Sequence, residues 1–472
     1  NGKPVLACRT VVDGGDIHIG PLPNFPVVKD LIVDRSRYED DFVRSLSYGD
    51  AGGRAPAATM DGSGIDYENL SCCIGCLVCN AACPVAEQMG YRYPSPAVIT
   101  EVLSAGVRVG GEGDDRAPLE DNIDFCSLCL NCQAACPSGV RLSRVNAQAK
   151  DAYAREKGRS LRDWMLGRAE LMGRLGSTAP VLSNRVLANA GVRRAMEAAL
   201  GISRRGGMVP YDRPFRHGPK RRSPGFAPSA AKRRVAYFVG CYTQYSDTDP
   251  AKDAVAVLED LGLHVEVPRQ RCCGLPLLAG GDMDAARKLA RENIALLQPW
   301  VEKGCDVVVS CTSCSLMLKH EYTGALGLEG AACLAASTHD LGDYLRRLAG
   351  SGELKLDLGP VPLVAAYHTP CHLRAQGVGL PFVELLQKVP ELEVHVLDAP
   401  CCGQSGSYGF KAEKADVSEA VGRHLSESLS ALAPDIGLSE CGPCQFRMLG
   451  GSGRPVARPV SILRKALSRS GA

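Results

Sequence analysis

Cysteine is the residue type whose number and spacing point most directly to chemistry. The chain of 472 residues contains 22 cysteines, most of them in close and regular runs. A chain of this length does not need disulfides to hold its core. Closely spaced thiols also suit metal ligation in a reducing compartment better than disulfide pairing. We therefore expect a cytoplasmic metal-binding protein.

Two cysteine runs share the spacing Cys-x2-Cys-x2-Cys-x3-Cys-Pro. They are Cys73, Cys76, Cys79 and Cys83, and Cys126, Cys129, Cys132 and Cys136. This is the spacing of two-cluster bacterial ferredoxins, in which the fourth cysteine of each run binds the other cluster. Three thiolates on one tight loop cover only three corners of a cubane cluster. The predicted cofactor ligands are therefore Cys73, Cys76, Cys79 and Cys136 for one [4Fe–4S] cluster, and Cys83, Cys126, Cys129 and Cys132 for a second. Zinc prefers two separated pairs of ligands, so this spacing disfavours zinc.

The C-terminal half contains one set of five cysteines twice. The two sets are Cys241, Cys272, Cys273, Cys311 and Cys314, and Cys371, Cys401, Cys402, Cys441 and Cys444. Corresponding members lie 129 or 130 residues apart, which predicts two homologous lobes. Five thiolates exceed what one cubane cluster requires, and adjacent cysteines can serve neighbouring irons. A glycine follows each adjacent pair and permits a tight backbone there.

Short apolar runs precede several cysteines of the lobes. Val235–Val239 lies before Cys241, and Val307–Val309 lies before Cys311. These runs look like buried strands and alternate with helical stretches such as Ala285–Leu297, which is the pattern of α/β layers. Ligand sites in open α/β sheets lie beyond the carboxyl ends of the strands. We therefore expect one metal site per lobe, at the strand ends.

Two histidines flank Cys371 in the sequence His-Thr-Pro-Cys-His. His368 and His372 could protonate a leaving thiol or tune a cluster, and either could equally well only hydrogen-bond the loop. Cys305 and Cys333 fit neither lobe pattern. We expect both in the core, because free cysteine is often buried.

Composition divides the chain into five parts. These are residues 1–45, residues 60–200 with the two cysteine runs and then helical spacing from about 145, a basic Gly/Pro-rich linker at 201–232, and lobes at 233–350 and 360–470. The net charge of +2 gives no indication of a nucleic-acid partner. No apolar stretch is long enough to span a bilayer, so membrane contact is expected only through a partner. No Gly-rich dinucleotide-binding signature follows a strand, so a flavin is expected on another chain.

The two lobes resemble the CCG domains of the heterodisulfide reductase family, which includes the C subunit of anaerobic glycerol-3-phosphate dehydrogenase. All ten cysteine positions of the motif are filled. The resemblance implies one non-cubane [4Fe–4S] cluster per lobe, and two clusters that together form or cleave a disulfide. It thereby implies catalytic roles for the ten cysteines, and the position of His368 and His372 beside Cys371 makes both candidate catalytic residues as well.

The N-terminal part resembles the iron–sulfur subunit of succinate dehydrogenase and fumarate reductase. The residues that carry this resemblance are Asn1–Cys8 and Pro21–Asp34. It implies that Cys8 is the last ligand of a plant-type [2Fe–2S] cluster whose other ligands would precede Asn1, so we expect the chain to be a fragment. In that family a [3Fe–4S] cluster lacks the ligand that Cys129 supplies here. The family's quinone-site histidine is replaced by Ser127, which puts a quinone pocket at this place in doubt.

A front of this type joined to complete CCG lobes is similar to the B subunits of the thiol:fumarate reductases of methanogens. The resemblance implies an oxidoreductase subunit that oxidises coenzyme M and coenzyme B thiols to a heterodisulfide. Electrons would pass to a FAD-containing partner that reduces fumarate. Two alternatives stay open: a subunit of a menaquinone-linked fumarate reductase or succinate dehydrogenase, and an electron relay of the anaerobic glycerol-3-phosphate dehydrogenase type.

These features predict a multidomain α+β fold. Its expected parts are the end of a plant-type ferredoxin β-grasp domain, an α-helical two-cluster ferredoxin domain, and two duplicated α/β CCG lobes.

Overall fold

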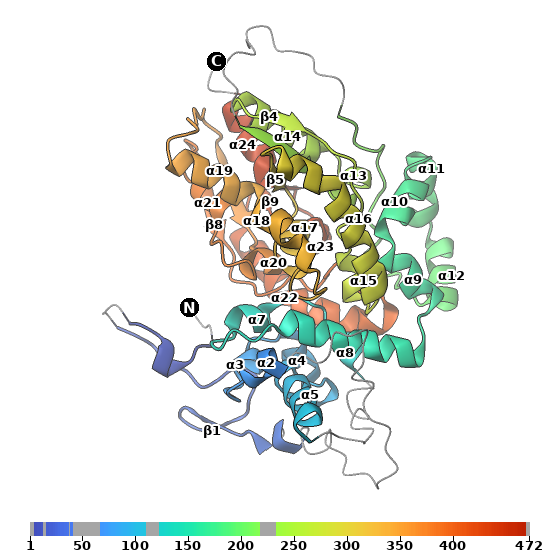
Figure 1. The fold of residues 1–472 in the computed structure, drawn as a ribbon, viewed down its shortest axis with the longest axis vertical. Coiled ribbons are helices and arrows are strands. Elements are labelled where there is room, and N and C mark those ends of the chain that lie inside the picture. The colour runs from blue at the N-terminus through green and yellow to red at the C-terminus, as the bar shows by residue number, and fades with distance from the viewer. Residues whose placement is uncertain are drawn as a thin grey trace. The chain divides into compact units, whose positions relative to one another are not determined.

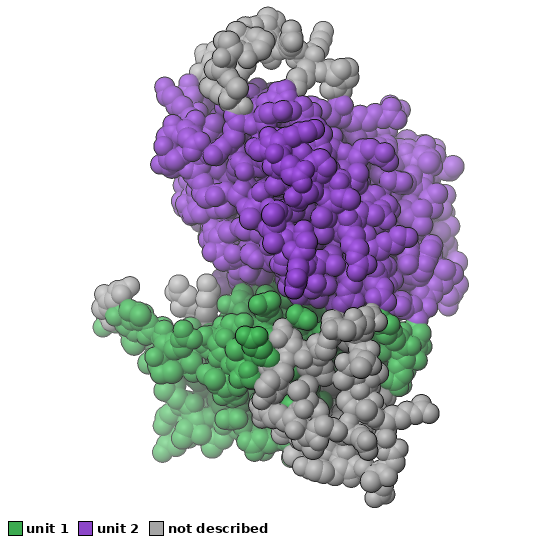
Figure 2. Space-filling view, in the orientation of Figure 1, with its two compact units in different colours: residues 1–158, 279–281 green, residues 159–278, 282–472 purple. Residues whose placement is uncertain are grey.

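The computed structural model describes residues 4–12, 16–36, 38–40, 67–109, 122–217 and 233–468. The chain forms two compact units, Asn1–Gly158 with Ala279–Gly281, and Arg159–Leu278 with Asp282–Ala472 (Figure 1, Figure 2). Part of the basic linker expected at 201–232 lies outside the described residues, because 218–232 are not described. The five-part division expected from composition stays a prediction.

The first unit is mainly helical. Its helices are α2 (Tyr67–Ser71), α3 (Val78–Ala81), α4 (Pro84–Met89), α5 (Pro96–Val109), α7 (Asn131–Ala135) and α8 (Leu142–Lys157). A short antiparallel hairpin of β1 (Val27–Lys29) and β2 (Ile32–Val33) precedes them. Val98 and Val102 of α5 pack with Val145 of α8 in the core. The expected helical two-cluster ferredoxin domain is thus confirmed as a fold.

The second unit begins with four helices, as the helical spacing of this stretch predicted. They are α9 (Leu161–Gly167), α10 (Ala169–Gly176), α11 (Pro180–Ala188) and α12 (Ala190–Leu200). Ser160 caps α9 by accepting a hydrogen bond from the backbone N–H of Asp163, and Asn189 caps α12 in the same way. Gly201 ends α12 in the left-handed conformation that glycine adopts readily.

Two four-stranded parallel sheets follow in this unit. The first has the order β4-β3-β5-β6, with β3 (Arg234–Phe238), β4 (His264–Glu266), β5 (Asp306–Val309) and β6 (Thr338–Asp340). The second has the order β8-β7-β9-β10, with β7 (Leu363–Tyr367), β8 (Leu392–Val396), β9 (Ile436–Leu438) and β10 (Val456–Ala457). The identical strand order confirms two duplicated α/β lobes.

The two lobes share one hydrophobic core. Helices of the first lobe are α13 (Cys241–Tyr245), α14 (Asp249–Asp260), α15 (Leu275–Ala279), α16 (Met283–Glu302), α17 (Thr312–Leu316), α18 (Ala332–Ala336) and α19 (Leu341–Gly350). Those of the second are α20 (Cys371–Arg374), α21 (Pro381–Leu386), α22 (Ala415–Leu432), α23 (Gly442–Ser452) and α24 (Pro459–Leu467). Helix α14 packs on α24 and α19 packs on α21, so Tyr344 and Phe382 lie in the same buried cluster. Among the described residues, no helix combines the length and hydrophobicity needed to cross a membrane.

Candidate iron–sulfur sites

Four thiols of the first unit line one pocket. They belong to Cys73, Cys76, Cys79 and Cys136, the set predicted from the run spacing. Tyr38 and Glu101 line the same pocket. Burial, followed by the charges of the neighbouring thiols, raises the pKa of Cys79. The fourth thiol therefore does come from the other run, as a shared cubane site requires.

The other four thiols of the two runs are buried together. They belong to Cys83, Cys126, Cys129 and Cys132. Burial and then the charges of Cys129, Cys83 and Cys126 raise the pKa of Cys132. Burial likewise raises the pKa of Cys83 to about 12. A thiol in such a place favours the neutral form unless a cation binds it, which fits an iron site. That iron binds here stays a prediction.

Backbone conformation explains how each run encircles one point. The residues on both sides of the second cysteine of each run have positive φ. They are Gly75 (64°) and Leu77 (62°) in the first run, and Leu128 (50°) and Leu130 (63°) in the second. Positive φ is unfavourable for leucine, and such strain is concentrated at functional sites. The same unusual conformation in both runs indicates that the thiols must converge.

The end of the first run and the start of the second are held by local contacts. Cys83 is the N-cap of α4, and Pro84 occupies its first turn, where the missing N–H costs nothing. Lys150 of α8 is buried and donates hydrogen bonds to the carbonyl oxygens of Cys126 (2.7 Å) and Asp124 (3.3 Å). A lysine charge thus lies beside the second set of thiols.

The five cysteines of the first lobe form one continuous chain of sulfur contacts. The Sγ atoms of Cys241 and Cys272 are 3.6 Å apart. Further thiol hydrogen bonds join Cys272 to Cys273, then Cys273 to Cys314, and Cys314 to Cys311. Cys241 begins α13 after β3, and Cys311 caps α17 after β5. The set therefore lies at the carboxyl ends of the central strands, as expected.

The second lobe repeats this chain in the same order. Cys371 contacts Cys401, which contacts Cys402, and the chain continues through Cys444 to Cys441. The hydrogen bond from Cys401 lowers the pKa of Cys371 to about 6. In the first lobe, the hydrogen bond from Cys314 lowers the pKa of Cys311 to about 5. All 22 cysteines lie among the described residues and none is in a disulfide, so the five thiols of each set are free to bind an iron–sulfur group as thiolates.

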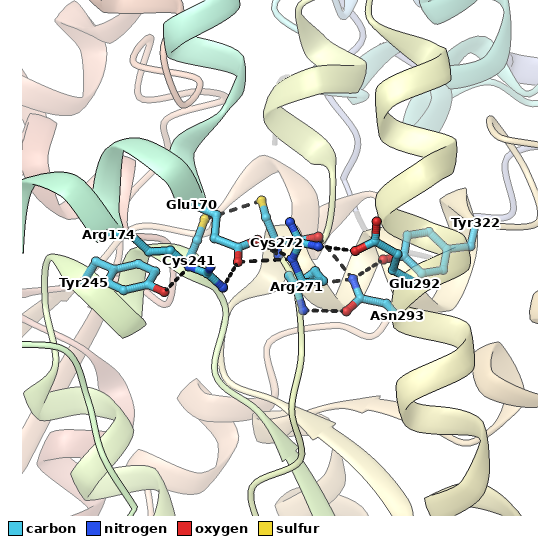
Figure 3. A network of polar contacts seen from close by, with 9 residues as sticks. All are labelled: Glu170, Arg174, Cys241, Tyr245, Arg271, Cys272, Glu292, Asn293 and Tyr322. Atoms are coloured by element: carbon cyan, nitrogen blue, oxygen red, sulfur yellow. Dashed lines mark hydrogen bonds and ion pairs between the residues drawn. The ribbon is translucent and has the colours of Figure 1, made fainter.

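A polar network holds both the backbone N–H and the carbonyl oxygen of Cys272 (Figure 3). Glu170 of α10 accepts a hydrogen bond from the backbone N–H of Cys272 at 2.9 Å. Arg174 and Arg271 donate to the same carboxylate at 2.6 Å and 3.2 Å. Asn293 of α16 donates to the carbonyl oxygen of Cys272 at 3.1 Å. Sequence reasoning missed Glu170, because no motif marks it and it lies 102 residues from Cys272.

Arg458 links the two lobes at their cysteine sets. Its side chain is buried, and Nη1 donates hydrogen bonds to the carbonyl oxygens of Glu440 (2.7 Å) and Ser310 (3.3 Å). These two residues directly precede Cys441 and Cys311. One guanidinium therefore connects the backbones at equivalent points of both sites, and nothing in the sequence singled it out.

The two candidate histidines have different surroundings. His368 is fully buried, and one of its ring nitrogens lies with the Sγ atoms of Cys402 and Cys444, all within 4.8 Å of one another. His372 is partly exposed, and its Nδ1 lies 2.8 Å from Oγ of Ser313 in the first lobe. His368 therefore belongs to the second sulfur set, whereas His372 contacts α17 of the first lobe, the helix that contains Cys314.

Four cysteines belong to none of the four sets: Cys8, Cys72, Cys305 and Cys333. Cys8 and Cys72 are exposed, and Cys305 is buried as expected. The expectation that Cys333 lies in the core is wrong, because this residue is exposed. Leu334 fills the core position of α18, and a neighbouring residue on a helix points about 100° away.

Three protein-family models match the chain, one of them twice. Residues 235–319 and 365–448 each match the cysteine-rich CCG domain. Residues 69–140 match a 4Fe-4S dicluster domain, and residues 1–40 match a 2Fe-2S iron-sulfur cluster binding domain. The matches bear out the iron–sulfur character of the two N-terminal parts and the CCG character of the two lobes.

Curated relatives extend over most of the chain. The C subunit of anaerobic glycerol-3-phosphate dehydrogenase of Escherichia coli is 31% identical over 410 residues, which cover 85% of this chain and 99% of the relative. The B subunit of fumarate reductase (CoM/CoB) of Methanothermobacter marburgensis is 26% identical over 455 residues, covering 95% and 81%. The glycolate oxidase iron-sulfur subunit of Escherichia coli is 24% identical over 419 residues, covering 85% and 95%. The chain therefore belongs to the family of the C subunit of anaerobic glycerol-3-phosphate dehydrogenase, as an iron–sulfur electron-transfer subunit of an oxidoreductase.

Proposed function

We propose that the chain is the thiol-oxidising, electron-transferring subunit of a thiol:fumarate reductase-type complex. The observation that carries the proposal is the presence of two complete five-thiol sets within one unit, in matching order. Five thiols per set exceed the four that a cubane relay cluster requires. The 2Fe-2S match at residues 1–40 and the relative named as the B subunit of fumarate reductase (CoM/CoB) support the same proposal.

The proposed reaction oxidises two thiols and reduces fumarate. Coenzyme M and coenzyme B thiols bind between the lobes, lose two protons and two electrons, and form one S–S bond. Non-cubane [4Fe–4S] clusters held by the ten lobe cysteines would supply the electron-accepting chemistry there. Fumarate takes up two electrons and two protons at FAD on a partner subunit and becomes succinate.

His372 is the residue that we propose takes up a thiol proton. It is only partly buried, and it lies where α20 of the second lobe meets α17 of the first. Its hydrogen bond with Ser313 holds the imidazole at this contact. An imidazole can accept a proton near neutral pH, which thiol oxidation requires.

The cysteines of the first unit are proposed to pass electrons towards the partner. The sets containing Cys79 and Cys132 lie close enough for the charge of one thiol to act on the other. Both sets would hold [4Fe–4S] clusters, and Cys8 would be the last ligand of the [2Fe–2S] cluster before FAD. Lys150 donates to the carbonyl oxygen of Cys126 and pairs with the carboxylate of Asp124 at 3.4 Å, so it fixes the start of the second run.

A second candidate function is electron relay without thiol chemistry. It is favoured by the 31% identity to the C subunit of anaerobic glycerol-3-phosphate dehydrogenase over 99% of that protein. In this case the lobes would pass electrons from a flavoprotein dehydrogenase to an acceptor such as menaquinone. Against a succinate dehydrogenase-type quinone pocket stands Ser127, where that family has histidine.

The two functions are distinguished by anaerobic turnover of the complete complex. The first predicts that two thiols disappear for each succinate formed, and that Cys401→Ser abolishes this reaction. The same variant keeps fumarate reduction with reduced viologen, which bypasses the lobes. Turnover with a menaquinol analogue and none with the two coenzyme thiols would reject thiol oxidation and favour the relay.

A further inference from the structure

Among the buried positions at which the two five-thiol sets differ is the one three residues before the first cysteine. His368 follows β7, and Phe238 ends β3 at the corresponding place. Each lies three residues before the first cysteine of its set, Cys371 or Cys241. Both side chains are fully buried. The first lobe therefore has phenylalanine at the position where the second has histidine.

The imidazole of His368 is buried beside sulfur atoms. Neither Nδ1 nor Nε2 has a nitrogen or oxygen partner among the described residues, and the ring instead lies in hydrogen-bonding contact with the thiol of Cys402. One ring nitrogen lies within 4.8 Å of the Sγ atoms of both Cys402 and Cys444. A fully buried donor without an acceptor is costly, so sulfur is the acceptor that this position offers.

We propose that His368 donates a ring N–H hydrogen bond to sulfur at the second CCG site and makes the two sites unequal in reduction potential. This inference rests on the proposed iron–sulfur ligation by the lobe cysteines. A hydrogen bond to sulfur is stronger when the site carries the additional negative charge of the reduced state. Such bonds therefore raise the reduction potential.

The comparison between the lobes favours hydrogen bonding over nitrogen ligation. Both lobes contain the same five thiols in the same order, and the first lobe needs no nitrogen. Phe238 offers no donor, so the first site lacks this stabilisation. His372 does not replace His368 as this donor, because its Nδ1 lies at hydrogen-bonding distance from Ser313 of the other lobe. His368 thus raises the reduction potential of the second site by a hydrogen bond that Phe238 cannot supply at the first.

Anaerobic redox titration of the holoprotein tests this inference, followed by EPR and by Mössbauer spectroscopy of 57Fe-enriched protein. His368→Phe reproduces the first lobe, and His368→Gln keeps an N–H donor. His395→Phe on β8 is the matched control, since His395 is partly exposed and pairs with Glu393. His368→Phe should lower the reduction potential of one CCG site by about 59 mV for a one-electron step. At fixed potential, this raises the oxidised-to-reduced ratio of its signal about tenfold. His368→Gln should shift it less, and His395→Phe should not shift it.

Pulsed EPR supplies a second readout. In the wild type, one of the two CCG signals should show weak coupling to a histidine nitrogen, and His368→Phe should remove it. Unchanged potentials with both signals intact would overturn the role of His368 and leave the proposed function standing. The strong coupling of an iron-bound nitrogen would overturn it as well. A wild-type protein without CCG signals would instead refute the proposed function.

Discussion

Replacing Glu170 by alanine should destabilise the second unit through the peptide of Cys272. The carboxylate accepts the buried N–H of Cys272 at 2.9 Å, and no other acceptor of this N–H is evident among the described residues. Leaving a buried N–H unpaired costs about 1–3 kcal/mol. The ion pairs to Arg174 and Arg271 involve guanidinium groups that are 57% and 37% exposed, so each contributes only about 0–1 kcal/mol. We therefore expect Glu170→Ala to lower the free energy of unfolding by about 2–4 kcal/mol.

Two variants separate the contributions to this effect. Glu170→Gln keeps an oxygen that can accept the N–H of Cys272 and loses only the ion pairs, so it should cost about 1 kcal/mol. Glu292→Ala is the matched control, because Glu292 pairs with Arg271 and does not contact Cys272. It should cost about 0–1 kcal/mol.

Anaerobic urea unfolding followed by tryptophan fluorescence measures these differences. The chain has two tryptophans, Trp164 and Trp300, and both lie in the second unit, so the signal reports on that unit. Iron content of each purified variant shows whether the first CCG site still fills. The reasoning fails if Glu170→Ala stays within about 0.5 kcal/mol of the wild type, below the cost of an unpaired buried N–H. It fails equally if Glu292→Ala costs as much as Glu170→Ala.

Three further predictions concern other parts of the structure. Gly403→Ala should destabilise the protein more than Gly274→Ala in urea unfolding. Both glycines have positive φ (75° and 91°), but an added Cβ would lie 2.0 Å from a backbone oxygen at Gly403 and 3.4 Å from one at Gly274. Equal losses of stability would contradict this. Burial raises the pKa of Asp340 from 3.8 to about 7, so the unfolded chain gives up its proton at lower pH and the folded state loses stability as the pH rises from about 4 to about 7. Asp340→Asn should flatten this slope in unfolding measured at about pH 5 and about pH 8, and an unchanged slope would rule out Asp340 as its source. Cys136→Ala and Cys83→Ala should each remove a different [4Fe–4S] EPR signal, and loss of the same signal in both would refute the exchange of ligands between the runs.

Cysteine spacing was sufficient to predict how the thiols group. The spacing of the two runs predicted that their fourth cysteines exchange, and Cys136 lines one pocket with the first three thiols of the first run. The repeat of five cysteines likewise predicted two sheets of one topology, because duplicated sequence folds into duplicated structure. Spacing is informative here because ligand geometry is local and tolerates little variation. Which cysteines bind which cluster stays a prediction.

Contacts made over long sequence separations could not be predicted in this way. Glu170 is one acidic residue in an amphipathic helix, and nothing nearby indicates that it accepts a hydrogen bond from Cys272. The meeting of His372 with Ser313 depends on how the lobes pack, which their separate patterns do not encode. The same holds for Cys333, whose exposure follows from which face of α18 turns towards the core.

Arg458 bears on how the duplicated protein can evolve. A tandem repeat ordinarily leaves a spare copy that can be lost or exchanged. Here a side chain from near the end of the second copy satisfies the carbonyl of Ser310 in the first copy. Deleting the second copy would leave that carbonyl and the shared apolar interior without their partners. The two copies must therefore evolve together, because a substitution at Arg458 removes a hydrogen bond from both of them.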